Sequence, residues 1–215
     1  MTHINISQTH IYFQNQKCYE KSINVNSVLT HTIFMCGRFH LGFSRKDTQK
    51  LLHDIPDEQQ IMLKFGDIYP TSFAPILTAE EVIVARWGFE RFDRKGVLIN
   101  ARAETVTERQ TFRKSFLERR CLIPANGFYE WDSEKRKYYF TRNDGGLLYL
   151  CGFYRVEDGE HRFIILTKNA TPPVAKYHNR IPVIAENHIK HKYLTDLYFA
   201  SDYIHEGNKI KLKTG

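Results

Sequence analysis

One cysteine of this 215-residue chain directly follows an internal methionine, in the run Met35-Cys36-Gly37-Arg38-Phe39. If translation starts at Met35, removal of that methionine leaves Cys36 as the first residue, because the small cysteine side chain permits the cleavage. The α-amine of Cys36 would then have a pKa of about 7.7–8.0, so an appreciable fraction of it is neutral in the cell. Amine and thiol can add to one aldehyde carbon and close a thiazolidine ring, and the second addition gains from proximity. The alternative is a buried structural cysteine, a common environment for a free thiol.

A second polar cluster, Asn100-Ala101-Arg102-Ala103-Glu104-Thr105, follows an apolar run that is typical of a strand. It offers an amide, a guanidinium and a carboxylate close together in the chain. Asn100 and Arg102 are two positions apart, so they share one face where the chain is extended. The alternative is a strand-to-loop turn that carries a surface ion pair.

Two further clusters offer groups that can move protons. Glu130 stands between Tyr129 and Trp131, directly after an apolar strand-like run. Partial burial there would raise its pKa and suit it to proton transfer. His178 lies in a predicted loop before a strand and can act as a general acid or base. The alternatives are an exposed strand glutamate flanked by packing aromatics, and a loop histidine that only hydrogen-bonds to the backbone.

The elements that must position these groups are mostly short strands. Strand-like runs occupy residues 82–85, 97–99, 138–140, 147–150 and 163–166. Two turn sequences, Asn143-Asp144-Gly145-Gly146 and Asp158-Gly159, separate predicted strands as hairpins. Hairpins with few helices predict an α+β fold with a largely antiparallel sheet.

Three helices are predicted beside these strands. Ser44 has the residue type that commonly begins a helix. Thr107 and Gln110 form a capping-box pattern that precedes a run with Phe116 on its apolar face. A last helix is predicted over residues 187–200.

The composition limits the class of protein. Hydrophobic residues make up 42% of the chain, an ordinary globular share that argues against disorder. The apolar runs are too short to cross a bilayer. The four cysteines form no CxxC pair and no His completes a zinc site, so we expect reduced thiols in a cytoplasm, without a metal or an organic cofactor. The net charge of +7 and the sequence pI near 9.2 allow an acidic partner such as nucleic acid.

Residues 1–34 differ from the rest of the chain. Their only charges are Lys17, Glu20 and Lys21, they lack Gly and Pro, and they show no sustained hydrophobic period. The pattern is not that of a signal peptide. We interpret 1–34 as a leader, either a misassigned start or a removed pro-segment, and 35–215 as one domain.

Several motifs resemble, in this order along the chain, those of the SRAP family, the abasic-site-processing proteins also called SOS-response-associated peptidases. The resemblance spans about residues 35–185. The motifs are MCGRF (35–39), RWGF (86–89), NARAET (100–105), RCLIPANGFYEW (120–131), FIILTKNA (163–170) and HNRIPVI (178–184).

The resemblance implies a barrel-like, largely antiparallel sheet with a few flanking helices. It also implies a protein that binds single-stranded DNA and traps the aldehyde of an abasic site in a thiazolidine on an N-terminal cysteine. On this chain Cys36 would be the nucleophile, Asn100 would orient its amine or thiol, Glu130 would shuttle protons, and His178 would assist the Schiff-base chemistry. Residues implied or expected to contact DNA are Arg38, Arg102, Trp87 and Trp131.

Two departures from the family pattern and two other functions accompany this interpretation. The leader before Cys36 would block its amine, and the segment from Tyr198 to Gly215 is shorter than the family pattern, as a truncated or divergent C-terminus would be. One alternative is an autopeptidase, a cysteine hydrolase that cleaves before Cys36. The other is a non-catalytic single-stranded DNA-binding module. We expect a monomer that does not bind a membrane and that is cytoplasmic, associated with the nucleoid when bound to DNA.

Overall fold

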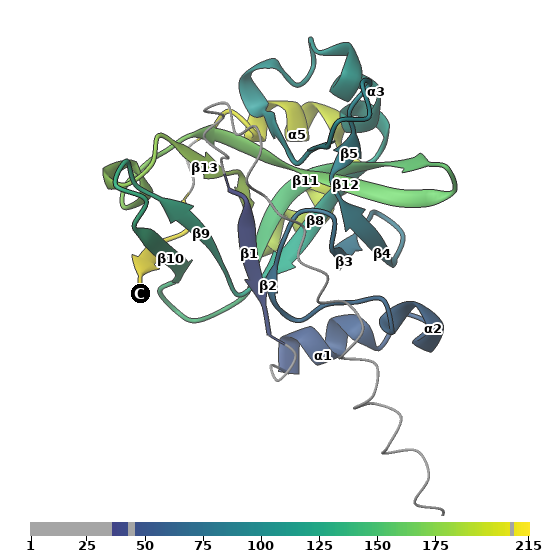
Figure 1. Cartoon of the computed structure of the whole chain (residues 1–215), viewed down its shortest axis with the longest axis horizontal. Helices are drawn as coiled ribbons and strands as arrows, with labels where there is room; N and C mark the ends of the chain where they lie inside the picture. The colour runs from purple at the N-terminus through teal and green to yellow at the C-terminus, as the bar shows by residue number, and fades with distance from the viewer. Residues whose placement is uncertain (1–35, 43–45, 207–208) are drawn as a thin grey trace, which may run out of the picture. The chain divides into compact units, whose positions relative to one another are not determined.

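The computed structural model describes residues 36–42, 46–206 and 209–215 (Figure 1). The predictions for the leader and for a helix start at Ser44 lie outside these residues. The helices are α1 (Lys46–Leu52), α2 (Asp57–Gln60), α3 (Gln110–Glu118), α4 (Lys190–Thr195) and α5 (Leu197–Tyr203), with 3-10 turns η1 (Ala103–Thr105), η2 (Val174–Lys176) and η3 (Asn187–Ile189). The strands are β1 (Arg38–Leu41), β2 (Gly66–Ile68), β3 (Phe73–Leu77), β4 (Val82–Trp87), β5 (Phe89–Glu90), β6 (Val97–Leu98), β7 (Asn100–Arg102), β8 (Arg120–Ala125), β9 (Gly127–Trp131), β10 (Lys137–Arg142), β11 (Leu148–Glu157), β12 (Glu160–Asn169), β13 (Arg180–Pro182), β14 (Ile184–Ala185) and β15 (Leu212–Thr214).

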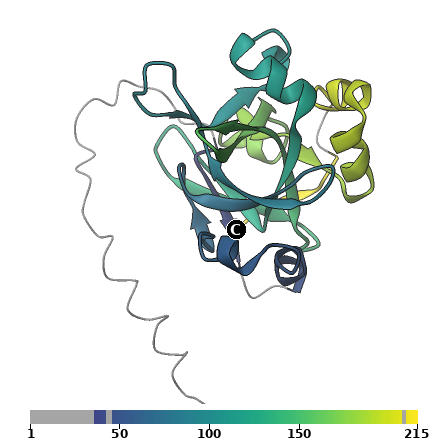
Figure 2. The ribbon, with the colours of Figure 1, turned by 90° about the vertical axis from the view of Figure 1, so that its right-hand side faces the viewer.

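Five strands close into a ring in the order β12, β4, β3, β8, β11 and back to β12. The pairs are antiparallel except for β12 with β4, which run parallel at Arg162 and Arg86. Figure 2 shows these strands curving around one another, with the teal helix α3 above and the yellow helices α4 and α5 to the right. The closed ring confirms the predicted α+β fold with a largely antiparallel, barrel-like sheet.

A second sheet continues from this barrel in the order β15-β10-β9-β1-β2. The chain passes from the barrel strand β8 to β9 through a single residue, Asn126. One face of the second sheet is apolar, with Phe39, Phe128 and Phe140 fully buried against the barrel core. In Figure 1 the C-terminal strand β15 lies beside β10, with which it pairs at Thr141 and Lys213. The C-terminal segment therefore adds an edge strand to this sheet.

The helices pack on a second apolar cluster outside the barrel. Phe116 of α3 and Tyr193 of α4 are fully buried there together with Phe153 of β11. The buried guanidinium of Arg120 donates hydrogen bonds to the carbonyls of Phe116 and Tyr193, at 3.1 and 2.9 Å. Because carbonyls at the end of a helix lack partners within the helix, Arg120 satisfies groups that burial would otherwise leave unpaired.

Three local predictions are wrong. Helix α3 begins after Arg109 without a side-chain cap, so the capping box at Thr107 does not form. The run 187–200 is broken at Asp196, whose carboxylate accepts a hydrogen bond from the Phe199 N–H at 3.0 Å and starts α5 as a new helix. The turn 143–146 joins β10 and β11, which lie in different sheets and do not form a hairpin.

Two further predictions, one of a hairpin turn and one of buried strand cysteines, are confirmed. Asp158 and Gly159 form a two-residue turn between β11 and β12, both with positive φ, as the tight turn requires. Cys121 and Cys151 are buried, unpaired strand residues.

No helix within the described ranges is long and apolar enough to span a bilayer. Among the same residues, no cluster of three or more His, Cys, Asp or Glu side chains is arranged to hold a metal ion.

Candidate active site

Cys36 lies at the entrance to β1 and is fully buried. Its φ of 39° falls in the left-handed region, which residues with a side chain seldom adopt. Its backbone N–H donates a hydrogen bond to Oε1 of Glu130 at 3.0 Å. Because Met35 precedes Cys36 in the sequence, this nitrogen is a peptide nitrogen in the full-length chain. The structure thus places the atom that would be the α-amine directly against the carboxyl of Glu130.

Glu130 faces the interior of the molecule, although a charged side chain in a strand usually faces solvent. Its neighbours Tyr129 and Trp131 on β9 are half-buried, whereas Glu130 is 1% exposed. Burial raises the pKa of Glu130 to about 8, and the hydrogen bond from the Cys36 N–H lowers it only in part. A carboxyl with this pKa exchanges its proton near neutral pH, which is what general acid–base catalysis requires.

His178 completes the cluster from the loop between β12 and β13. Its Nδ1 lies 3.6 Å from Oε2 of Glu130 and accepts a hydrogen bond from the Arg180 N–H at 3.2 Å. Tyr177, the preceding residue, packs on the ring of Tyr138 at 4.0 Å between ring centroids, so the loop is held against β10. The three predicted residues that are far apart in sequence, Cys36, Glu130 and His178, therefore meet in one buried site.

Two polar atoms of this cluster have no hydrogen-bond partner among the described residues. They are Oε2 of Glu130 and Nε2 of His178, and both are buried. Since buried polar atoms are almost always paired, these two atoms are positions where water or a ligand can supply the partner. The thiol itself stays protonated at neutral pH, because burial and the charge of Glu130 raise the pKa of Cys36 well above its ordinary value.

Asn100 and Arg102 lie on β7, which pairs with the barrel strand β12. Their strand β7 runs parallel to β12, with Asn100 opposite Ile165 and Arg102 opposite Thr167. Arg102 is exposed, as a phosphate contact would need to be. The other edge of the same part of β12 pairs with β13, which follows His178. Strand β12 thus holds both the Asn100 strand and the His178 loop.

An ion pair that the sequence analysis missed joins these two segments. Arg180, 5% exposed, makes a bidentate contact with Glu104, with its two terminal nitrogens 2.6 and 2.8 Å from the carboxylate oxygens. This hydrogen bonding lowers the pKa of Glu104 to about 2, so the pair persists at any ordinary pH. Both residues stand inside recognised motifs, NARAET and HNRIPVI, but 76 positions separate them. Arg180 and Glu104 come together because the strands beside them, β13 and β7, both pair with β12.

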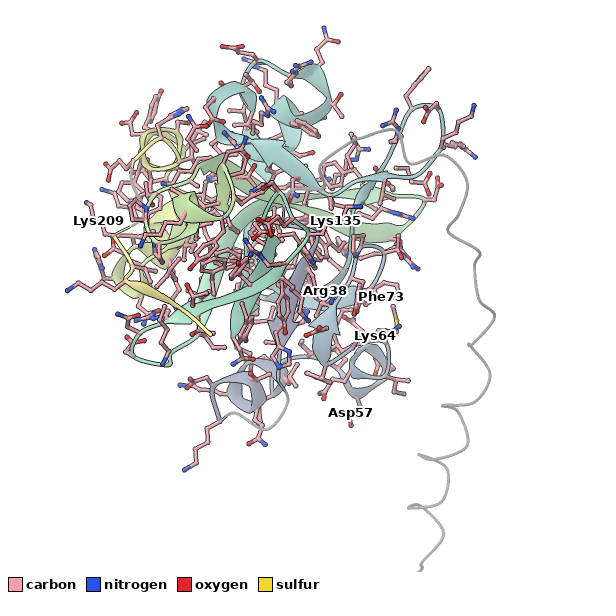
Figure 3. The ribbon with its side chains drawn as sticks, turned by 60° about the vertical axis from the view of Figure 1, so that its left-hand side comes forward. Arg38, Asp57, Lys64, Phe73, Lys135 and Lys209 are labelled. Atoms are coloured by element: carbon pink, nitrogen blue, oxygen red, sulfur yellow. The ribbon has the colours of Figure 1, made fainter. Side chains whose placement is uncertain are left out.

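Arg38 and Trp131 lie on the opposite, solvent-facing side of the second sheet. Register places Arg38 of β1 opposite Tyr129 of β9, which is opposite Tyr139 of β10. The guanidinium of Arg38 lies over the ring of Tyr69 at 4.4 Å and that of Trp131 at 5.2 Å. Figure 3 labels Arg38 near the centre of the view, below Lys135 of the turn between β9 and β10. We call this side the outer face, made up of Arg38, His40, Tyr129, Trp131, Lys137, Tyr139 and Lys213.

Trp87 is placed differently from Trp131. Its side chain is fully buried, packs on Phe39 at 5.2 Å between ring centroids, and donates its indole N–H to the Ile99 carbonyl at 3.0 Å. Trp87 therefore offers no surface to a nucleic acid in this structure. It supports the site from the core, through Phe39 beneath Arg38 and through the carbonyl of the residue before Asn100.

The chain is similar to known proteins of one family. Residues 35–206 match the family model described as SOS response associated peptidase (SRAP). The chain is 30% identical over 198 residues to the abasic site processing protein YoaM of Bacillus subtilis, covering 79% of this chain and 83% of that protein. It is 25% identical over 193 residues to an abasic site processing protein of Saccharomyces cerevisiae, covering 71% of this chain but only 52% of the yeast protein, so it spans about half of that relative's length.

Solved structures show the same fold. A Bordetella bronchiseptica protein superimposes with a TM-score of 0.67 at 22% identity, covering 83% of this chain and 98% of that one. A Bacteroides thetaiotaomicron protein gives a TM-score of 0.64 at 22% identity, with 83% and 91% of the two chains covered.

Proposed function

Because the chain belongs to the SOS response associated peptidase family, we propose that it is an abasic site processing protein that forms a covalent crosslink to single-stranded DNA through Cys36. One observation carries the proposal most strongly. The α-nitrogen of Cys36 lies 3.0 Å from a buried carboxyl whose pKa is near neutrality, with an imidazole on the other side of that carboxyl. The proposal applies to the form of the protein in which Cys36 is the first residue.

The first step is the opening of the abasic sugar. The closed hemiacetal must lose the proton of its hydroxyl and gain one on the ring oxygen to give the free aldehyde. Glu130 would take the first proton and return it to the ring oxygen, which is a transfer that a carboxyl of pKa about 8 can make in both directions. The unpaired Nε2 of His178 would hydrogen-bond to the sugar during this exchange.

The crosslink then forms in two additions. The neutral amine of Cys36 adds to the aldehyde carbon, and loss of one water gives an imine. The thiol sulfur adds to the imine carbon, and its proton ends on the nitrogen, which closes the thiazolidine. Because the Cys36 thiol is protonated in its buried site, the second addition needs a proton acceptor. Glu130 would fill this role, since it lies close enough for its charge to raise the pKa of the thiol. In this scheme Asn100 orients the amine or thiol, and Arg38 and Arg102 hold the phosphates beside the lesion.

The direct test is a denaturing gel of protein that begins at Cys36, incubated with a single-stranded oligonucleotide that carries one abasic site. We expect a shifted band that survives denaturation. A Cys36→Ser variant keeps the amine but lacks the thiol, so it should give a product only when borohydride reduces the imine. A shifted band of equal yield with Cys36→Ala would contradict the proposal.

The contact between the Cys36 nitrogen and Glu130 also favours a second activity, self-cleavage before Cys36. Cleavage of the bond between residues 35 and 36 must protonate the departing Cys36 nitrogen, and Glu130 lies within hydrogen-bond distance of it. The left-handed φ of Cys36 adds backbone strain beside that bond. Intact-mass measurement of protein expressed from Met1, compared with its Glu130→Gln variant, tests this autopeptidase activity. An unprocessed mass in both proteins argues against it and leaves the DNA chemistry of a Met35 start untouched.

A non-catalytic single-stranded DNA-binding module makes a different prediction from either activity. Such a module binds the oligonucleotide with a strong salt dependence and gives no band that survives denaturation. Binding and crosslinking measured on the same samples therefore separate the three functions.

A further inference from the structure

The outer face carries three half-buried aromatic side chains, Tyr129, Trp131 and Tyr139. The rings of Tyr129 and Tyr139 stack at 4.7 Å between centroids and 30° between planes. Trp131 stands two residues further along β9, on the same side. Beneath the Tyr139 ring lies Gly127, where an added Cβ would come within 2.5 Å of that ring. A glycine at this position lets the Tyr139 ring approach the backbone of β9 closely.

Cations surround these rings. The ammonium of Lys137 lies 4.9 Å from the ring centroid of Tyr129, and Arg38 lies 5.8 Å from the same ring on the other side. Lys213 of β15 is exposed and stands opposite Thr141. Thr141 is two residues after Tyr139 on β10, so Lys213 lies on the same side of the sheet as Tyr139. The acidic Asp67 at this surface already accepts hydrogen bonds from Tyr129 and His40, at 2.8 and 3.0 Å.

The outer face is built on the same two strands, β1 and β9, whose other side faces the candidate active site. Arg38 follows Cys36 by two residues, and Trp131 follows Glu130 directly. From β1 to β15 the sheet crosses three inter-strand spacings of about 4.8 Å, or about 14 Å in all. A sheet face of this kind has room for about two stacked bases, as in RNA-binding sheets whose aromatics stack two or three bases.

From this combination we infer that the outer face binds the single strand beyond the lesion, with bases stacked on Tyr129 and Tyr139 and phosphates held by Lys137 and Lys213. The inference rests on the proposed function for its ligand, single-stranded DNA, and extends it to a surface outside the reacting residues. Stacking on rings and charge contacts to phosphate are both independent of sequence, so the surface would accept any bases.

The test uses undamaged, fluorescein-labelled oligonucleotides, one too short to reach past the active site and one extended by several nucleotides, with affinity measured by fluorescence anisotropy. For the extended strand we expect Tyr139→Leu to weaken binding by about 5-fold to 100-fold, the range for loss of one base–aromatic stack. Tyr139→Phe keeps the ring and should keep the affinity. Tyr198→Leu, on a side chain of α5 that is 86% exposed, is the matched control elsewhere on the surface.

A second measurement does not depend on the stability of the aromatic variants. Lys137 and Lys213 are exposed, so a Lys137→Gln, Lys213→Gln double variant should fold normally. Loss of two phosphate contacts should lower the slope of log affinity against log salt by about 1.4 for the extended strand. Quenching of fluorescence on binding would report Trp131, because Trp87, the other tryptophan, is buried.

The outcomes separate this inference from the proposed function. Affinity for the extended strand that depends on Tyr139 and the two lysines supports the outer face, whether or not a crosslink forms at abasic sites. Unchanged affinity and salt slope in both variants would overturn it, even if crosslinking proceeds normally.

Discussion

The two sides of β9 differ in almost every physical property, although their residues alternate in the sequence. Glu130 points inward, is almost fully buried, and has a pKa raised by burial to about 8. Tyr129 and Trp131 point outward and contact the guanidinium of Arg38. The inner side is therefore suited to proton transfer in a site shielded from water, and the outer side to contact with a large charged ligand. One strand with a two-residue period separates chemistry from binding without a second domain.

The strongest test of this separation is Glu130→Gln. The amide keeps the size of the side chain but cannot transfer protons, so we expect the single-turnover crosslinking rate to fall by about 10²- to 10⁴-fold. Affinity for undamaged single-stranded DNA should stay within about twofold, because the outer face is unchanged. Glu134→Gln, on a turn side chain that is 67% exposed, is the matched control and should change neither the crosslinking rate nor the affinity. A loss of binding equal to the loss of rate would break the comparison.

A second test concerns the stability of the inner side. Burial raises the pKa of Glu130 from 4.5 to about 8, so between these pH values the folded state binds a proton that the unfolded state releases. The free energy of unfolding should therefore decrease as pH rises across this window, by about 1.4 kcal/mol per pH unit from this group. Urea unfolding of wild type and Glu130→Gln at both ends of the window measures the difference. Parallel stability curves for the two proteins would show that burial does not perturb this carboxyl.

On the outer side, Arg38→Ala should weaken binding of single-stranded DNA by about 10-fold, through loss of one phosphate contact and its cation–π neighbours. At saturating DNA the crosslinking rate should change much less than it does in Glu130→Gln. Arg119→Ala, at the exposed end of α3, is the control for loss of a positive charge. If Arg38→Ala lowered the rate at saturation as strongly as Glu130→Gln, the two sides would be one functional unit.

The smallest effect is expected away from both sides. Asp196→Ala removes the N-cap of α5, which should cost about 1 kcal/mol of unfolding free energy and lower the Tm by about 2–4 °C. Crosslinking and DNA affinity below the transition should match the wild type. Thermal unfolding and the two functional assays on one preparation check this variant.

These two sides also show how far sequence patterns reach. The motifs predict Cys36, Glu130 and His178 as one site, and the structure brings these three together. Alternation along β9 puts Trp131 on the far side of the sheet from Glu130, but the position of Arg38 on that same side follows only from the register of β1 with β9. The Arg180–Glu104 pair escapes prediction for a similar reason, since both partners reach each other only across β12.

The errors in local structure have more than one cause. A turn sequence at 143–146 predicts a reversal of the chain but not whether the strands on either side pair, and β10 and β11 pair with other strands instead. The run 187–200 has helical composition throughout, yet Asp196 offers its carboxylate to the Phe199 N–H and begins a second helix. Local propensity identifies the kind of element, a cap within a run can divide it, and pairing with distant strands decides its neighbours.

The closed barrel has a consequence for how the protein is made. Strand β12 completes the ring by pairing with both β11 and β4, so the sheet cannot close until residues 160–169 have left the ribosome. Until then β4 and β11 each present an unpaired edge, and such edges join readily to strands of other chains. Pairing between segments as distant as Arg86 and Arg162 also slows folding. We therefore expect nascent chains that stop short of β12 to need protection from aggregation, and chains released after β12 to lose that need.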